Sequence, residues 1–243
     1  MDPGRDRGAG HDGQLRAAFQ AAATLMNDIR NYFNKSLHLI VVIGLCVAFS
    51  GARAGSFDDF FSAIRNDNAS KLASLLSRGF DPNTRDEKGQ PGLTIAMREQ
   101  SPKAAAALLA RPDIDVNALN SAGESALMMA ALKGDMADVQ LLLARGAKVN
   151  QPGWSALHYA ATGPNVNIVQ LLLDRGAAID AASPNNSTPL MLAAQYGPED
   201  SVRLLLKRGA DVKRHNQLDL GAVDFARKSG REPVVKLIEQ AQR

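Results

Sequence analysis

The sequence has little of what most enzymes and metalloproteins use for chemistry: one cysteine, four histidines and only 5% aromatic residues. The cysteine, Cys46, lies in an apolar run, so the chain from residue 55 onward has no thiol for disulfide, redox or metal chemistry. In the same part only His158 and His215 remain, and no two potential ligands have the spacing of a metal site. No glycine-rich phosphate loop occurs. We therefore expect no metal and no cofactor.

Long hydrophobic runs are also missing. The longest, from Leu39 to Phe49, has 11 residues, short of the roughly 20 needed to cross a bilayer but within the usual length of a signal-peptide core. Ala52-Arg53-Ala54 then has the small-x-small form of a cleavage site. We interpret residues 26–54 as a signal peptide and residues 55–243 as the exported domain.

Two alternatives stay open for this region. Residues 1–25 are either a disordered extension or the result of a misassigned start, because a signal peptide that begins at Met26 instead of Met1 would have a normal length. An uncleaved signal would instead leave the protein anchored in the inner membrane.

A concentration of positive charge is missing from the exported part. From residue 55 on, 22 Lys or Arg face 21 Asp or Glu, and the basic residues mostly alternate with acids. A phosphate-binding surface needs clustered positive charge, so we expect no nucleic acid as a partner.

Three internal stretches repeat in register: "SALMMAALKGDMADVQLLLARGAKVN" from Ser125, "SALHYAATGPNVNIVQLLLDRGAAID" from Ser155 and "TPLMLAAQYGPEDSVRLLLKRGADVK" from Thr188. Such self-similarity marks a stacked-repeat protein. Each stretch opens with a hydroxyl side chain that can cap a first helix, and Pro189 suits the first helical turn. A leucine triplet then marks a second helix, and we expect Arg145, Arg175 and Arg208 in its last turn; the glycines that follow are Gly146, Gly176 and Gly209.

This pattern resembles the ankyrin repeat, a 33-residue unit with a Thr-Pro-Leu-His-x-Ala signature. The resemblance implies an all-α solenoid of stacked helix–turn–helix repeats joined by short hairpin fingers. We expect about six repeats with atypical ends, at residues 57–86, 87–119, 120–151, 152–182, 183–215 and 216–243. Because one helix pair cannot bury its own apolar face, the repeats must stack on one another.

Ser155 and His158 would interest a reader looking for a nucleophile and its base. The sister repeats have Met128 and Met191 where His158 stands, and thioethers cannot act as bases. The resemblance implies that this histidine ties the capping hydroxyl to nearby backbone. We therefore expect no catalytic residues and a non-enzymatic protein.

In ankyrin-like stacks, partners dock on the concave side formed by finger tips and first helices. Alignment to the family pattern places nine residues there: Arg98, Glu99, Glu124, Leu132, Lys133, Trp154, Thr162, Gln195 and Tyr196. Trp154 is the only tryptophan, and its finger is three residues shorter than its siblings between Asn150 and Ser155. We expect the short finger to leave a local notch that Lys133 and Tyr196 flank. Tryptophan is enriched at binding hot spots, but local packing of Trp154 over its short finger is an equal alternative.

These observations predict a monomeric adaptor of the bacterial periplasm that binds another protein, as an accessory or protective partner of an exported enzyme or toxin. A secreted effector that binds a host protein is the alternative, and a hydrolase is the least favoured reading. The sequence does not identify the partner.

The signal-peptide interpretation makes a direct prediction. The exported chain should begin at Gly55, because the apolar core is short and ends near Ala-Arg-Ala. Intact mass of protein recovered from the periplasm measures this. A chain in the membrane fraction that still carries residues 39–49 would contradict the prediction.

Overall fold

The computed structural model describes residues 55–242, and the signal peptide interpreted from the sequence lies outside the described residues. The described part is helical, and its only bridge of extended backbone pairs Arg85 with Pro91. The first described helix covers residues 55–65, and α2 (Ala69–Ser77) completes the first repeat.

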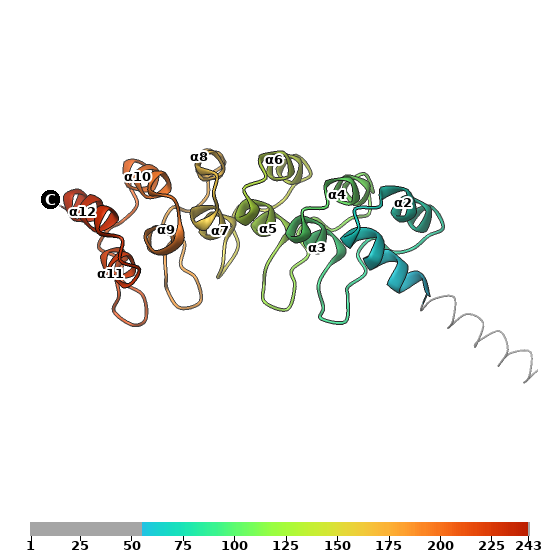
Figure 1. Cartoon of the computed structure of the whole chain (residues 1–243), viewed down its shortest axis with the longest axis horizontal. Helices are drawn as coiled ribbons and strands as arrows, with labels where there is room; N and C mark the ends of the chain where they lie inside the picture. The colour runs from blue at the N-terminus through green and yellow to red at the C-terminus, as the bar shows by residue number, and fades with distance from the viewer. Residues whose placement is uncertain (1–54, 243) are drawn as a thin grey trace, which may run out of the picture. The chain divides into compact units, whose positions relative to one another are not determined.

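Five further helix pairs follow, as the sequence predicts (Figure 1). Each pair consists of a first helix, a tight turn and a second helix. The pairs are α3 (Gly92–Glu99) with α4 (Pro102–Leu109), α5 (Ala126–Lys133) with α6 (Met136–Ala144), α7 (Ala156–Thr162) with α8 (Val166–Asp174), α9 (Pro189–Tyr196) with α10 (Glu199–Lys207), and α11 (Ala222–Lys228) with α12 (Glu232–Ala241). The all-α solenoid is thus confirmed.

The first helices form one layer and the second helices another, and the fingers all leave on the same side (Figure 1). Small residues let the first helices approach closely: Ala130, Ala160, Ala161 and Ala193 are at most 1% exposed. Larger side chains such as Leu172 fill the space between the two layers. The core is therefore continuous from one repeat to the next, as stacking requires.

The glycines after the second helices act as the sequence predicts. Gly146, Gly176 and Gly209 have φ values of +85°, +81° and +88°, which side chains with a Cβ rarely adopt. The preceding arginines stand just after their helices, at the C-cap position, and not within the last turn as expected. Positive charge there still lies at the negative end of the helix dipole.

Asparagine side chains join each repeat to the next behind these glycines. Asn150 donates to the carbonyl of Gly176 at 2.8 Å and accepts from the amide of Ala178 at 2.9 Å. Asn117 and Asn83 make the same pair of bonds one and two repeats earlier, respectively. Asp180, at the next equivalent position, only accepts, from the amide of Asp211 at 3.0 Å. We refer to these side chains as the asparagine clamps.

One core position of the second helices carries an acid. Asp138 stands where Ile168 and Ser201 stand in α8 and α10, and it is 8% exposed. Burial, and next the charge of Asp135, raises the pKa of Asp138 to about 6. A raised carboxyl pKa means that the charged form is less stable in the folded protein than in the unfolded chain.

The sign of the pH effect follows. Below about pH 4 Asp138 is protonated in both states and costs nothing, whereas between pH 4 and 6 the penalty for its charge grows to its full value. Asp138→Asn should therefore raise the melting temperature by about 3 °C or more at pH 7, and leave it nearly unchanged at pH 4. Thermal unfolding at both pH values measures this. An equal effect at the two pH values would contradict it.

Candidate protein-binding face

The predicted capping residues stand at the starts of first helices. Ser125 and Thr188 accept from the amides of Met128 and Met191 at 3.3 and 3.4 Å. Ser155 differs, because its hydroxyl lies 2.8 Å from Nδ1 of His158 instead of bonding to a helix amide.

His158 is fully buried and bonds in two directions. Its Nδ1 accepts from the backbone N–H of Ser155 at 3.2 Å, and its Nε2 lies 3.0 Å from the carbonyl of Ser187 in the next finger. Because a carbonyl only accepts, Nε2 must carry the proton, and the ring is the neutral Nε2–H tautomer. Burial lowers the pKa of His158, which favours the same neutral form.

In the sister repeats, other atoms accept the hydrogen bond from the amide that precedes the first helix. The N–H of Ser125 and of Thr188 points to the sulfur of Met128 and of Met191, at 3.4 Å in both cases. In the last repeat, the carboxylate of Asp224 accepts from the N–H of Gly221 at 2.9 Å. This position thus supplies an acceptor for the amide that precedes the helix.

The second repeat has no such acceptor bond. Pro91 precedes α3 and has no N–H, so the side chain at the equivalent position, Thr94, has no amide to accept from. The Thr94 hydroxyl is buried without a hydrogen-bond partner in the described structure. His158 therefore occupies a structural position, and with Ser155 at 1% exposure no substrate can reach this pair.

The structure links two predicted face residues, Trp154 and Glu124, through Tyr159. The Tyr159 hydroxyl donates to the Glu124 carboxylate at 2.7 Å, and its ring lies edge-on to Trp154 with the centroids 6.3 Å apart. Trp154 also meets the His158 ring edge-on, at 5.3 Å. Burial, and next the Glu124 contact, raises the pKa of Tyr159 well above its usual value. Half-buried Trp154 thus takes part in local packing.

The finger before α7 is visibly shorter than its neighbours, so it leaves a gap in the row of fingers (Figure 1). Lys133 and Tyr196, expected to flank this gap, end α5 and α9, whereas Trp154 precedes α7. A helix of this length is about 10 Å long, and Lys133 and Tyr196 lie at the opposite end of the first helices from Trp154. They therefore do not flank the gap.

The other predicted residues fall into two groups. Arg98 pairs with Glu99 at 3.2 Å and also donates to Gln90, so both charges are engaged. Leu132, Thr162 and Gln195 are half-buried, at or next to the ends of their first helices.

Tyr196 is the most exposed aromatic side chain of this layer, at 66%. Sequence reasoning gave it a minor place beside Trp154 and missed Tyr159, Leu119 and Leu218. Leu218 is 74% exposed on the last finger, and Leu119 is 39% exposed on the finger before α5. A leucine at a finger position where the equivalent fingers carry a polar residue or alanine is the signal that would have found Leu119 and Leu218.

Membrane-spanning helices and metal-binding clusters are both absent from the described residues. No helix from residue 55 to 242 is long and apolar enough to cross a membrane. Over the same residues, no group of three or more His, Cys, Asp or Glu side chains is arranged to hold a metal ion.

These features define a stacked helix-pair repeat protein in which the positions shared by the repeats serve architecture, while exposed positions of the fingers and first helices differ from repeat to repeat. The family model described as "Ankyrin repeats (3 copies)" matches residues 60–152 and 127–216. The chain belongs to the ankyrin repeat family.

Relatives and a solved structure share this region. The chain is 34% identical over 166 residues to a putative palmitoyltransferase from Danio rerio, and 32% identical over 170 residues to a putative ankyrin repeat-containing protein from Treponema pallidum (strain Nichols). The matches cover 68% and 70% of this chain, but only 21% and 47% of those proteins.

The solved structure of a predatory endopeptidase from Bdellovibrio bacteriovorus in complex with an immunity protein contains a chain of the same fold. The TM-score is 0.65 at 24% identity, over 75% of this chain and 97% of that chain.

The acceptor role of His158 can be tested with the residue of its own sister repeats. His158→Met should keep a sulfur acceptor for Ser155 and lose the bond to Ser187, at a cost of about 1 kcal/mol. His158→Ala loses the bonds to Ser155 and to Ser187 and leaves a void, so the loss should be about 2–3 kcal/mol. Denaturant unfolding measures both.

Partner binding should survive in both variants wherever the fold does. Equal losses from methionine and alanine would contradict the acceptor role. A hydrolytic activity that disappears at unchanged stability would overturn the structural assignment of His158 altogether.

Proposed function

We propose that this protein is a non-enzymatic adaptor that binds another protein through its finger face, which we define as the surface of the fingers and the first helices. One observation carries the proposal. Of the four large apolar side chains exposed in the described structure, Leu119, Tyr196 and Leu218 lie on the finger face, and only Leu141 lies on a second helix. Exposed apolar and aromatic side chains on one face are typical of interaction surfaces.

The absence of a catalytic role for the one histidine–serine pair supports a binding function. Both ring nitrogens of His158 form structural hydrogen bonds, and His158 and Ser155 are buried away from solvent, where a substrate would have to enter. The repeats also occupy the described chain from end to end.

We further propose that the protein acts in the periplasm as an accessory or protective partner of an exported enzyme or toxin. The apolar core before Ala-Arg-Ala supports export. The complex of an endopeptidase with an immunity protein, which contains a chain of this fold, offers a setting of the same kind. A secreted effector that binds a host protein is the second candidate, and it requires release from the cell.

The finger face predicts which substitutions abolish binding. Tyr196→Ala should weaken partner binding by about 2 kcal/mol or more, because an exposed aromatic side chain can bury a large area against a partner. Trp154→Ala should weaken it similarly if Trp154 also reaches the partner. The measurement is capture of a partner from periplasmic extract on the immobilised protein, and then titration of the captured partner.

Gln140→Ala is the matched control, since Gln140 is exposed on the second helix α6 and should tolerate truncation. Melting temperatures should be compared, because Trp154 contacts the buried His158 and its loss also affects the fold. Equal retention of the partner by the Tyr196 and Gln140 variants would show that the finger face is not the binding surface.

A further inference from the structure

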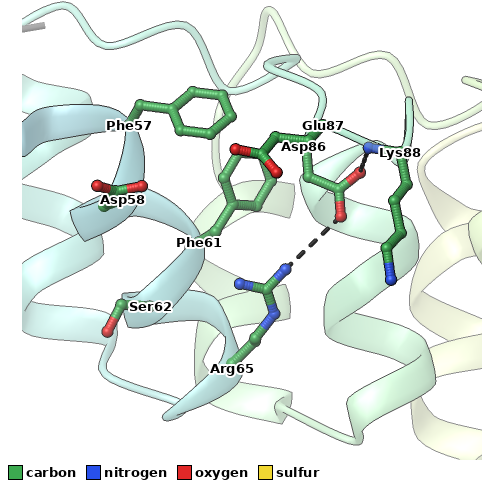
Figure 2. Close-up of a pocket in the computed structure, with 8 residues that line it drawn as sticks. All are labelled: Phe57, Asp58, Phe61, Ser62, Arg65, Asp86, Glu87 and Lys88. Carbon is green, nitrogen blue, oxygen red and sulfur yellow. Dashed lines mark hydrogen bonds and ion pairs between the residues drawn. The ribbon is translucent and has the colours of Figure 1, made fainter. Parts of the chain in front are cut away.

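A surface cleft of about 350 Å³ lies at the N-terminal end of the described stack, between the first described helix and the first finger (Figure 2). Phe57 and Phe61 form an aromatic wall, with ring centroids 4.9 Å apart in an edge-to-face arrangement. Arg65 follows one turn later on the same helix, and Glu87 and Lys88 come from the finger. The volume is at the lower end of the roughly 300–1,000 Å³ of ligand pockets, so one side chain of a partner would suit it.

Arg65 and Asp86 pair with each other within this cleft. Asp86 lies 3.6 Å from the Arg65 guanidinium and accepts from the backbone amides of Lys88 and Gln90 at 3.0 and 2.9 Å. Its side chain is 10% exposed. Asp86 therefore fixes the turn of the finger and compensates Arg65, and neither group needs a ligand.

Three charged side chains of the cleft have no ion pair in the described chain: the carboxylates of Glu87 and Asp58 and the ammonium group of Lys88. Glu87 is exposed, and its carboxylate has no hydrogen bond to any other residue of the described chain. Figure 2 shows it on the side of Phe57 and Phe61, whereas the side chain of Lys88 runs along the opposite side of the cleft. An unpaired carboxylate next to an aromatic wall favours a cation over an anion, because both the charge and the ring faces are negative.

The aromatic wall already accommodates one cation. The central carbon of the Arg65 guanidinium lies 5.8 Å from the centroid of the Phe61 ring, within the range of a cation–π contact. Phe57 has no such cation, and it is only half-buried, so it offers the free aromatic surface.

We propose that this cleft receives an arginine side chain of the partner protein, with its guanidinium against Phe57 and its charge paired to Glu87. Arginine fits better than lysine, because its planar group stacks on rings and can form two parallel bonds to one carboxylate. This inference rests on the proposed function and adds that the partner presents an arginine to the first repeat.

A small probe tests the cleft without the partner. The purified protein is titrated with N-acetyl-L-arginine amide, and in parallel with the citrulline analogue, which has nearly the same shape and no charge. In NMR spectra, the amide and ring resonances of Phe57 and the amide resonance of Glu87 should shift on addition of the arginine probe. The citrulline probe should bind about fivefold more weakly.

Three variants locate the interaction. Glu87→Gln should weaken the arginine probe about fivefold, while Lys88→Gln should strengthen it, because a competing cation leaves the cleft. Glu232→Gln removes an exposed carboxylate at the other end of the stack and should change nothing. The unchanged spectra of the rest of the protein verify the fold of each variant.

Several results would overturn the inference: equal binding of the arginine and citrulline probes, no effect of Glu87→Gln, or shifts spread over carboxylates outside the cleft. The absence of any shift would overturn it as well. The two proposals fail separately, because the probe titration needs no partner and the capture experiment with the Tyr196 variant does not depend on the cleft.

Discussion

No helix pair of this chain can bury its own apolar face, and the rest of the structure follows from that constraint. Each internal first helix is covered on two sides by the first helices of its neighbours, which alanines such as Ala130 and Ala160 make possible. Stacking alone does not fix the spacing of repeats, because small side chains give little resistance to sliding. The asparagine clamps add directional bonds: Asn83, Asn117 and Asn150 each both donate and accept across one repeat boundary, and Asp180 accepts across the next.

A second device acts within each repeat, at the start of the first helix. The amide that precedes the helix needs an acceptor, and the chain meets this need with a sulfur, an imidazole nitrogen or a carboxylate at the same position. Where Pro91 removes the amide, the need disappears. The side chains at this position differ between repeats, but they all accept the same hydrogen bond from the N-cap amide. The only extra gain comes at His158, whose second nitrogen reaches the next finger and joins the local cap to the stacking of repeats.

The fold could be predicted from the sequence because its signals are local and repeated. The glycines with positive φ, the capping hydroxyls and the leucine triplets all recur in register, so each repeat supports the assignment of the others. The binding face was predicted only as a set of positions. Alignment gives the place of Trp154 but not its exposure, which depends on how Tyr159 and His158 pack beside it.

The cleft at the first repeat was missed for a related reason. Its wall comes from the helix at residues 55–65 and its acid from a finger more than twenty residues later, and the sequence near Phe57 departs from the repeat pattern. Register can align equivalent positions between repeats, but it cannot place an atypical end against the finger beside it. That contact appears only in three dimensions.

The described part of the chain is nearly neutral as a whole, but its net charge changes from one end of the stack to the other. Residues 56–124 carry eight Lys or Arg and ten Asp or Glu, whereas residues 207–243 carry nine and five. Some of the terminal cations are engaged, since Arg227 pairs with Glu239 and Arg231 donates to carbonyls at the end of α9. Lys213 and Arg214 on the last finger are exposed and have no ion pair in the described part of the chain.

The stack thus runs from a slightly acidic start, through a middle in which five Lys or Arg nearly balance six Asp or Glu (residues 125–206), to a basic end. Charge order of this kind steers approach and sets orientation more than it adds affinity. A partner that presents its basic side to the first repeat and its acidic side to the last would meet complementary charge along the whole face. The apolar centre can then supply most of the binding energy, because the charged ends have already excluded the reversed orientation.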